Sequence, residues 1–204
     1  MPNYRRARDA GATYFFTVCT HRRQPLLTQE PVRIALRQAI ERTRTTRPFT
    51  IDAWVLLPDH LHCLWTLPAV DGDFSARWAM VKQYTSKLCR EHLAQRGLPA
   101  SRHKRYELGF WQRRFWEHRI RDERDFGQHV DYIHWNPLKH GYVQRVADWP
   151  HSTFHRYVAQ GVYPMDWAGV GHAELTEMEF GEYRDGVWGI PRWSLGNTEM
   201  EFGE

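Results

Sequence analysis

Alternating apolar and polar positions in the first third of the chain predict three strands. Residues 12–20, 49–57 and 60–67 are rich in aromatic and β-branched side chains, which favour extended structure. Pro58 and Asp59 separate the second of these segments from the third and are typical turn residues. We therefore expect the second and third strands to form an antiparallel hairpin with a tight connection.

The apolar spacing changes to that of a helix in four other segments. Thr28 and Asp122 are placed to cap the first and third of them, each ahead of an apolar repeat. Pro137 is expected to end the third, because a proline disfavours helical geometry in the residue before it. Residues 110–120 alternate cationic and aromatic groups and predict a further strand. The predicted helices span residues 28–45, 75–96, 123–135 and 148–160.

Two histidines begin the strand that follows the turn, and their spacing puts them on the same face. Successive side chains of a strand point to opposite faces, so His60 and His62 project together while Leu61 and Cys63 point into a core. Two imidazoles side by side on a sheet form half of a metal site. A surface strand that happens to carry two histidines shows the same pattern, so other residues must decide between the two interpretations.

Tyr132 and Asn136 lie four residues apart in the third predicted helix, and hence on one face of it. If that face covers the two histidines, an amide oxygen and two imidazoles surround a divalent cation and leave open positions for a scissile phosphate. The phenol of Tyr132 is then placed as a nucleophile that forms a phosphotyrosine, which conserves the energy of the broken phosphodiester. The alternative is a packed tyrosine and an asparagine that merely ends the helix.

Charge divides the chain into a basic body and an acidic tail. Residues 1–163 carry 26 Lys and Arg against 15 Asp and Glu, whereas residues 164–204 carry 2 against 9. We expect one domain over the first range and an acidic C-terminal extension over the second. The heptad Thr-Glu-Met-Glu-Phe-Gly-Glu occurs twice in the extension, at residues 176–182 and 198–204. A tail that competes with DNA for the basic body is one hypothesis, and an inert solubilising tail is the other.

Composition narrows the classes of function. The chain has 10 Trp, 9 Tyr and 10 Phe; with a basic body these suit single-stranded nucleic acid, although a solvated basic surface over an aromatic core has the same composition. No stretch approaches the roughly 20 apolar residues of a membrane span. Neither a signal peptide nor a glycine-rich phosphate loop is visible, and three cysteines suit free thiols in a reducing compartment. We expect a cytoplasmic, nucleoid-associated protein without a membrane or nucleotide cofactor.

Six segments, in order along the chain, resemble the REP-associated tyrosine transposases, relatives of the IS200/IS605 single-strand transposases with the HUH fold. Together they are far more specific than the His-x-His pair by itself. They span residues 14–18, 53–63, 110–118, 129–133, 136–141 and 148–155. The chain after about Gly169 departs from the family pattern, so no family role is carried onto it.

The resemblance implies an α+β fold in which an antiparallel, ferredoxin-like sheet is flanked by helices. It implies that His60 and His62 are metal ligands, that Asn136 is the third ligand and that Tyr132 is the single catalytic tyrosine. The family uses Mg²⁺ or Mn²⁺, and the mixed imidazole and amide ligands suit Mn²⁺ better. Its substrates are single-stranded repetitive extragenic palindromes (REP), which form hairpins with a tetranucleotide at the 5′ foot. Cleavage in the family leaves a 5′-phosphotyrosine and a free 3′-hydroxyl.

We therefore expect a metal-dependent DNA endonuclease and strand transferase that acts as a monomer or homodimer. The alternative is a non-catalytic binder of hairpin DNA or RNA that keeps these residues for structure. Cationic and aromatic groups in loops and on the second predicted helix are the candidates for contact with DNA. They are Arg22, Arg23, Lys82, Lys87, Arg102, Arg105, Arg113, Arg114, Trp116 and Lys139.

Overall fold

The computed structural model describes residues 9–95 and 109–167, together with the short segments 183–184 and 187–188. The chain divides into two compact units, residues 1–167 and 168–204. In the second unit, β5 (Tyr183–Arg184) and β6 (Val187–Trp188) pair antiparallel. Both copies of the heptad, like Arg102 and Arg105, lie outside the described residues.

A four-stranded antiparallel sheet forms the centre of the first unit, in the order β2-β3-β1-β4. The predicted hairpin of β2 and β3 is confirmed, and the segment of alternating cationic and aromatic residues does supply a short fourth strand. In the register of the sheet, Thr17 of β1 and Val55 of β2 both lie opposite His62 of β3. The strands are β1 (Thr13–Cys19), β2 (Thr50–Leu56), β3 (His60–Thr66) and β4 (Trp116–Arg119).

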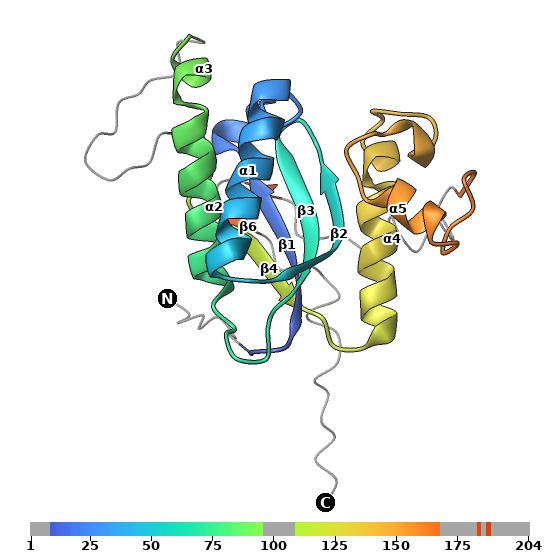
Figure 1. Ribbon diagram of the computed structural model, residues 1–204. Helices are drawn as coiled ribbons and strands as arrows, with labels where there is room; N and C mark the ends of the chain where they lie inside the picture. The colour runs from blue at the N-terminus through green and yellow to red at the C-terminus, as the bar shows by residue number, and fades with distance from the viewer. Residues whose placement is uncertain (1–8, 96–108, 168–182, 185–186, 189–204) are drawn as a thin grey trace, which may run out of the picture. The chain divides into compact units, whose positions relative to one another are not determined.

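Helices cover both faces of this sheet, as the α+β prediction requires (Figure 1). Helices α1 and α2 lie on one side of it, and α4 with α5 lies on the other. Their bounds are α1 (Glu30–Thr46), α2 (Phe74–Leu88), α3 (Arg90–Gln95), α4 (Glu123–Lys139) and α5 (Phe154–Ala159), with 3₁₀ turns η1 (His21–Arg23) and η2 (Val146–Asp148). No helix in the described part of the chain is both long and apolar enough to cross a membrane.

The face of the sheet toward α1 and α2 carries the main hydrophobic core. Phe16 of β1 and Trp65 of β3 contact Trp78 of α2, and the two tryptophan rings stack with centroids 4.1 Å apart. Leu61 and Cys63, the alternate residues of the histidine strand, are fully buried in this core, as predicted. Each large apolar side chain that is fully buried contributes about 1.5–3 kcal/mol, so this face stabilises the sheet.

Two predicted helices differ from the observed ones in the first half of the chain. The first helix begins at Glu30 with Gln29 as its cap, not Thr28, and Ile34 lies half exposed on its outer side. The helix predicted over 75–96 is two helices that meet at Cys89. Just before this point the hydroxyls of Thr85 and Ser86 donate to carbonyls four residues earlier, a pattern that bends helices.

The third predicted helix was expected to end at Trp135, and this is wrong. Helix α4 runs on to Lys139 and includes Pro137. A proline removes its own N–H from the helical ladder and crowds the carbonyl four residues earlier, but the carbonyls of the last turn still find donors. The His140 amide donates to Asn136 O at 3.1 Å, and the Tyr142 amide donates to Pro137 O at 3.0 Å. Asn136 therefore lies within a helix, and the backbone before and after it is helical.

Candidate active site between the sheet and helix α4

His60 and His62 lie at the start of β3 on the face toward α4, and each is only 4% exposed. Their ring centroids are 4.9 Å apart, with the ring planes at 84°. The tight turn before His60 is anchored by the chain that follows β1, because the Thr20 amide donates to Asp59 O at 2.9 Å. The alternation predicted from the sequence thus places both imidazoles together on a fixed strand end.

Each imidazole is held through its Nδ1 atom. His60 Nδ1 lies 2.6 Å from Asp59 Oδ1, and His62 Nδ1 lies 2.8 Å from Thr17 Oγ1. We assign the ring proton to Nδ1 in both residues, so that each donates to an oxygen and leaves the Nε2 lone pair available. Partners of this kind fix the tautomer and orientation of metal-binding histidines.

Asp59 is itself fixed by a cation. The Arg23 guanidinium lies 3.4 Å from Asp59 Oδ2. Burial by itself would raise the pKa of Asp59, but the hydrogen bond from His60 and the charge of Arg23 lower this pKa below its ordinary value. Arg23 has a φ of 56°, in the left-handed region that non-glycine residues rarely adopt. Such conformations cost free energy and cluster at functional sites.

The electrostatics of the pair favour neutral imidazoles. Burial lowers the pKa of His60, although the hydrogen bond to Asp59 raises it in part. Burial, together with the charge that His60 would carry, holds the pKa of His62 well below the usual range. Both rings are therefore neutral at pH 7, which is the form that coordinates a metal ion.

Tyr132 meets these histidines from α4. Its ring centroid lies 5.3 Å from that of His62, and the residue is 5% exposed. Phe15 of β1 packs beside both rings, with centroid distances of 5.4 Å to His62 and 6.1 Å to Tyr132. Two turns later on α4, Lys139 places its Nζ 5.3 Å from the centre of the Tyr132 ring. A phenol beside an ammonium is suited to carry negative charge as a nucleophile or a leaving group.

Asn136 provides the test of whether a metal ion fits this site. It is fully buried, and neither its amide oxygen nor its amide nitrogen has a hydrogen-bond partner within the described residues. Leaving a buried polar group unpaired costs about 1–3 kcal/mol. A cation bound by Asn136 Oδ1 and by Nε2 of His60 and His62 would satisfy this oxygen, and such a donor set suits a divalent ion. The chemistry of these three side chains therefore fits a divalent metal ion.

Three further residues belong to the site but were not predicted. The ring of His140 lies 5.5 Å from that of His60, and burial, aided by His60 and Lys139, lowers the pKa of His140 to about 4. His140 was not predicted to lie in the site, because the helix was expected to end at Trp135. Asp59 could have been found from its position directly before His60. Thr17 could not, because it is 45 residues from His62 and only the strand register joins them.

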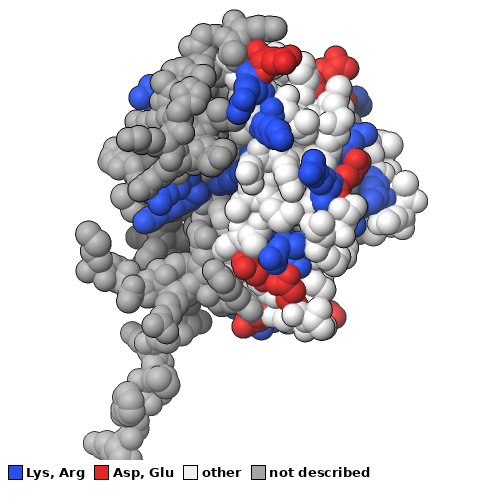
Figure 2. Space-filling view, turned by 60° about the vertical axis from the view of Figure 1, so that its left-hand side comes forward, with Lys and Arg blue, Asp and Glu red and all other residues white. Residues whose placement is uncertain are grey.

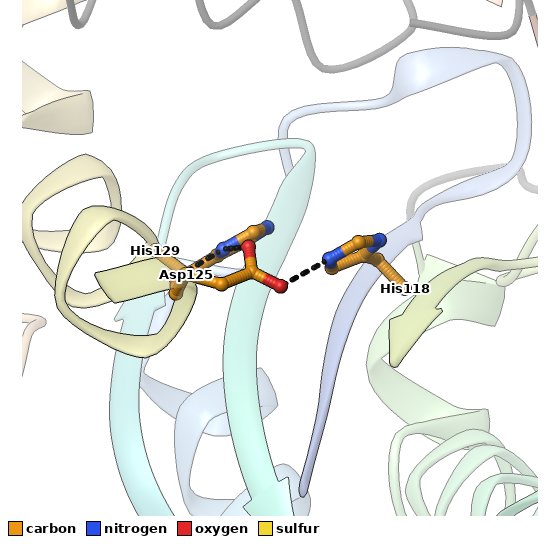
Figure 3. Close-up of side chains that lie close together, drawn as sticks. All are labelled: His118, Asp125 and His129. Atoms are coloured by element: carbon orange, nitrogen blue, oxygen red, sulfur yellow. Dashed lines mark hydrogen bonds and ion pairs between the residues drawn. The ribbon is translucent and has the colours of Figure 1, made fainter. Parts of the chain in front are cut away.

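A second group of possible metal ligands lies at the other end of α4 (Figure 3). Asp125 of α4 lies between His118 of β4 and His129 of α4 in this view, and the candidate ligand atoms of all three lie within 4.8 Å of one another. Asp125 Oδ2 accepts from His118 Nε2 at 2.9 Å and from the Arg121 amide at 3.0 Å, and Asp125 Oδ1 lies 3.1 Å from His129 Nδ1. Because these atoms already bond to one another, we interpret the group as a structural contact that holds α4 against β4.

This network also reaches the tyrosine. Phe15 packs against His129 on one side, with ring centroids 4.8 Å apart, and against Tyr132 on another. Burial would raise the pKa of Asp125, but hydrogen bonds from His129 and His118 hold this pKa well below its ordinary range. The carboxylate is thus charged at every physiological pH and keeps the first turns of α4 in place ahead of Tyr132.

The residues predicted to contact DNA occupy different environments. Arg23 is engaged by Asp59, and Lys82 donates to Gln112 O at 2.8 Å and lies over the Phe115 ring, so it fastens the segment before β4 to α2. Trp116 is half-buried. On the face drawn in Figure 2, basic side chains are spread widely over the described surface. The predicted residues that are exposed are Arg22, Arg23, Lys87, Arg113, Arg114 and Lys139.

Comparison with known proteins gives consistent matches. A family model described as "Transposase IS200 like" matches residues 10–136. A REP-associated tyrosine transposase of Escherichia coli (strain K12) is 48% identical over 183 residues, which cover 89% of this chain and 98% of that protein. A relative from Haemophilus influenzae is 44% identical over 170 residues, covering 83% of this chain and 94% of its own length. A solved structure of a REP-associated tyrosine transposase bound to a REP hairpin superposes with a TM-score of 0.70 at 49% identity, covering 83% of this chain and 93% of that one.

Proposed function

The chain belongs to the IS200-like transposase family, and from this premise we propose that it binds REP-type hairpins and cleaves single-stranded DNA at their foot through Tyr132. The family match spans most of the chain, and a relative with 49% identity has been solved with a REP hairpin. The observation that carries the choice of nucleophile is the approach of the Tyr132 ring to His62, 5.3 Å between centroids. This approach supports the proposal, because a phosphate held by a metal at the histidines would lie near the Tyr132 ring.

In this proposal His60 and His62 hold a divalent cation through Nε2, and Asn136 holds it through Oδ1. The bound cation supplies Lewis-acid stabilisation to the phosphoryl oxygens of the scissile phosphate. We propose Mn²⁺ as the better fit and Mg²⁺ as the weaker one, because two of the three protein ligands are imidazoles. Asp59 and Thr17 keep both imidazoles in the tautomer that presents Nε2.

The chemistry proposed for the chain is a phosphoryl transfer to tyrosine. Tyr132 Oη gives up its proton to solvent and attacks the phosphorus, the bond from phosphorus to the 3′ oxygen breaks, and the leaving oxygen takes up a proton from solvent to become a 3′-hydroxyl. The phosphate stays on Tyr132 as a 5′-phosphotyrosine. Attack by a 3′-hydroxyl reverses the step and rejoins the strand, so no nucleotide cofactor is needed. The Lys139 ammonium beside the ring stabilises the tyrosinate that leaves.

A covalent adduct tests this function directly. The protein is incubated with single-stranded palindromes from its own genome and Mn²⁺, and the products are separated on a denaturing gel. We expect a protein–DNA adduct that forms with a hairpin and its 5′ foot and is absent when the foot is scrambled or the metal is chelated. Tight hairpin binding with no adduct for any palindrome would instead favour the non-catalytic binder.

A further inference from the structure

A cavity of about 620 Å³ lies at the β2 edge of the sheet, between α1 and the chain at residues 150–156. Trp54 and Leu56 of β2 line it. Val55, between them in the strand, lies opposite His62, and paired residues of antiparallel strands share a face. The cavity therefore opens on the face of the sheet away from Tyr132, one strand removed from the histidine pair.

Four arginines surround this cavity. Arg33, Arg37 and Arg44 come from one side of α1, where they are spaced by four and seven residues, and Arg156 comes from α5. Glu41 is the single carboxylate among the described residues that line the cavity. We call these four arginines, with the cavity between them, the arginine groove.

The local contacts orient these cations without neutralising them. Arg44 Nε donates to Phe49 O at 2.9 Å, and the Arg156 guanidinium donates to the backbone carbonyls of Ile51 and Asp52. The Asp52 carboxylate acts on Arg156 electrostatically, but it is engaged by Thr66 and does not line the cavity. Arg33 Nε is buried and has no hydrogen-bond partner within the described residues. An anion in the groove would supply the missing acceptor.

The floor of the groove is apolar and aromatic. Trp54 is half-buried there, with Leu36, Ile40 and Leu56 around it. Guanidinium groups at the rim and an aromatic ring on the floor are the combination that binds single-stranded nucleic acid, because the cations hold phosphates and the ring contacts a base. A small acidic ligand would use the charge but would leave the apolar floor unexplained.

We propose that the arginine groove binds the single-stranded DNA that flanks the hairpin. This inference rests on the proposed function, since it adds a second contact region for the same substrate. It explains why three arginines of α1 and one of α5 gather at the β2 edge of the sheet, apart from the histidine pair of β3. It also separates two tasks, since cleavage belongs to the α4 face and retention of the flanking strand belongs to the β2 edge.

Two DNA ligands distinguish the groove from the active site. One is a hairpin with its 5′ foot only, and the other carries an additional single-stranded flank. Affinity is measured by fluorescence anisotropy over a range of salt concentrations for the wild type, for Arg33→Gln/Arg37→Gln, and for Arg42→Gln. Arg42 is the matched control, because it is an exposed arginine of the same helix that lies over the Tyr84 ring and not in the groove. Circular dichroism establishes that all variants fold.

For the wild type and for Arg42→Gln, we expect the flank to tighten binding by roughly tenfold. For Arg33→Gln/Arg37→Gln we expect the flank to add less than about twofold. The slope of log affinity against log salt for the flanked ligand should also fall by about 1.4, or ~0.7 for each phosphate that the two arginines no longer neutralise. An equal gain from the flank in all three proteins would overturn the proposal. An equal loss for both ligands in the double variant would place the hairpin stem in the groove and would also overturn it. A wild type that binds neither ligand would contradict the proposed function instead.

Discussion

The two faces of the central sheet are built from alternate residues of the same strands, yet they differ in what holds them together. On the α1–α2 face, Leu61 and Trp65 of β3 pack among apolar side chains, where area and shape are sufficient. On the α4 face, His60 and His62 are equally buried but depend on individual hydrogen bonds to Asp59 and Thr17. Burying a polar group without its hydrogen-bond partner is costly. Few other residues could therefore replace these histidines and their partners, and polar groups held in this way can take part in a reaction.

The largest expected effect is on the α4 face. Tyr132→Phe removes only the phenol oxygen, so we expect DNA cleavage to fall by a factor on the order of 10⁴ or more. Hairpin binding and the melting temperature should stay near the wild-type values. Tyr157→Phe, on α5, is the control and should cleave normally. Cleavage by Tyr132→Phe at the wild-type rate would assign the nucleophile to another residue.

The neighbouring residues Leu61 and His62 sharpen the comparison, because they lie one position apart on opposite faces. Leu61→Ala leaves a cavity in the core, so we expect a loss of about 2–5 kcal/mol in the free energy of unfolding. At temperatures where it remains folded, it should still cleave DNA with Mn²⁺. His62→Ala should lose metal binding and cleavage, which calorimetry with Mn²⁺ and a cleavage assay measure. Retained metal-dependent cleavage in His62→Ala would break the assignment of this face.

Substitution of Asp125 tests whether the polar residues on the α4 face also stabilise the fold. Asp125→Asn removes a charged partner from a buried network, so we expect a loss of about 3 kcal/mol in unfolding free energy at pH 7. The pKa of Asp125 is depressed in the folded protein, so its stabilisation is complete above the unfolded pKa near about 4. It is lost as the pH falls from there through the lower folded pKa. Urea unfolding at pH 7, 5, 4 and 3 should show the difference between the wild type and the variant beginning to narrow below about pH 4; a constant difference would contradict the ionic role.

The smallest effect is expected from Thr17, which forms a hydrogen bond to the proposed metal ligand His62. Thr17→Val keeps the shape of the side chain but removes the oxygen that orients His62. Losses of this kind cost about 10- to 100-fold in metal affinity, which a titration with Mn²⁺ would measure. Thr43→Val, in which a buried hydroxyl of α1 donates to the Ala39 carbonyl instead of an imidazole, is the control and should change metal affinity little. Equal effects of the two substitutions would mean that the Thr17 contact does not tune the site.

The sequence predicted most of the features that depend on periodicity. It placed the β2–β3 hairpin, the inward-facing Leu61 and Cys63, and the common face of Tyr132 and Asn136, because each depends on residues close together in the chain. It did not predict the Thr17 partner of His62 or the His140 ring beside His60. The first depends on pairing between distant strands, and the second on a helix that continues through Pro137 because later amides satisfy its carbonyls. The arginine groove was missed for the same reason, since α1 and residues 150–156 meet only in the folded chain.

The central claim is that Tyr132, and no other tyrosine, carries the DNA after cleavage. The adduct formed with a single-stranded REP-type hairpin and Mn²⁺ can be digested with protease and nuclease and mapped by tandem mass spectrometry. The account predicts that the peptide containing Tyr132 carries a nucleotide, joined through its 5′ phosphate to the phenol oxygen. A nucleotide on Tyr142 or Tyr157, with an unmodified Tyr132 peptide, would contradict this claim.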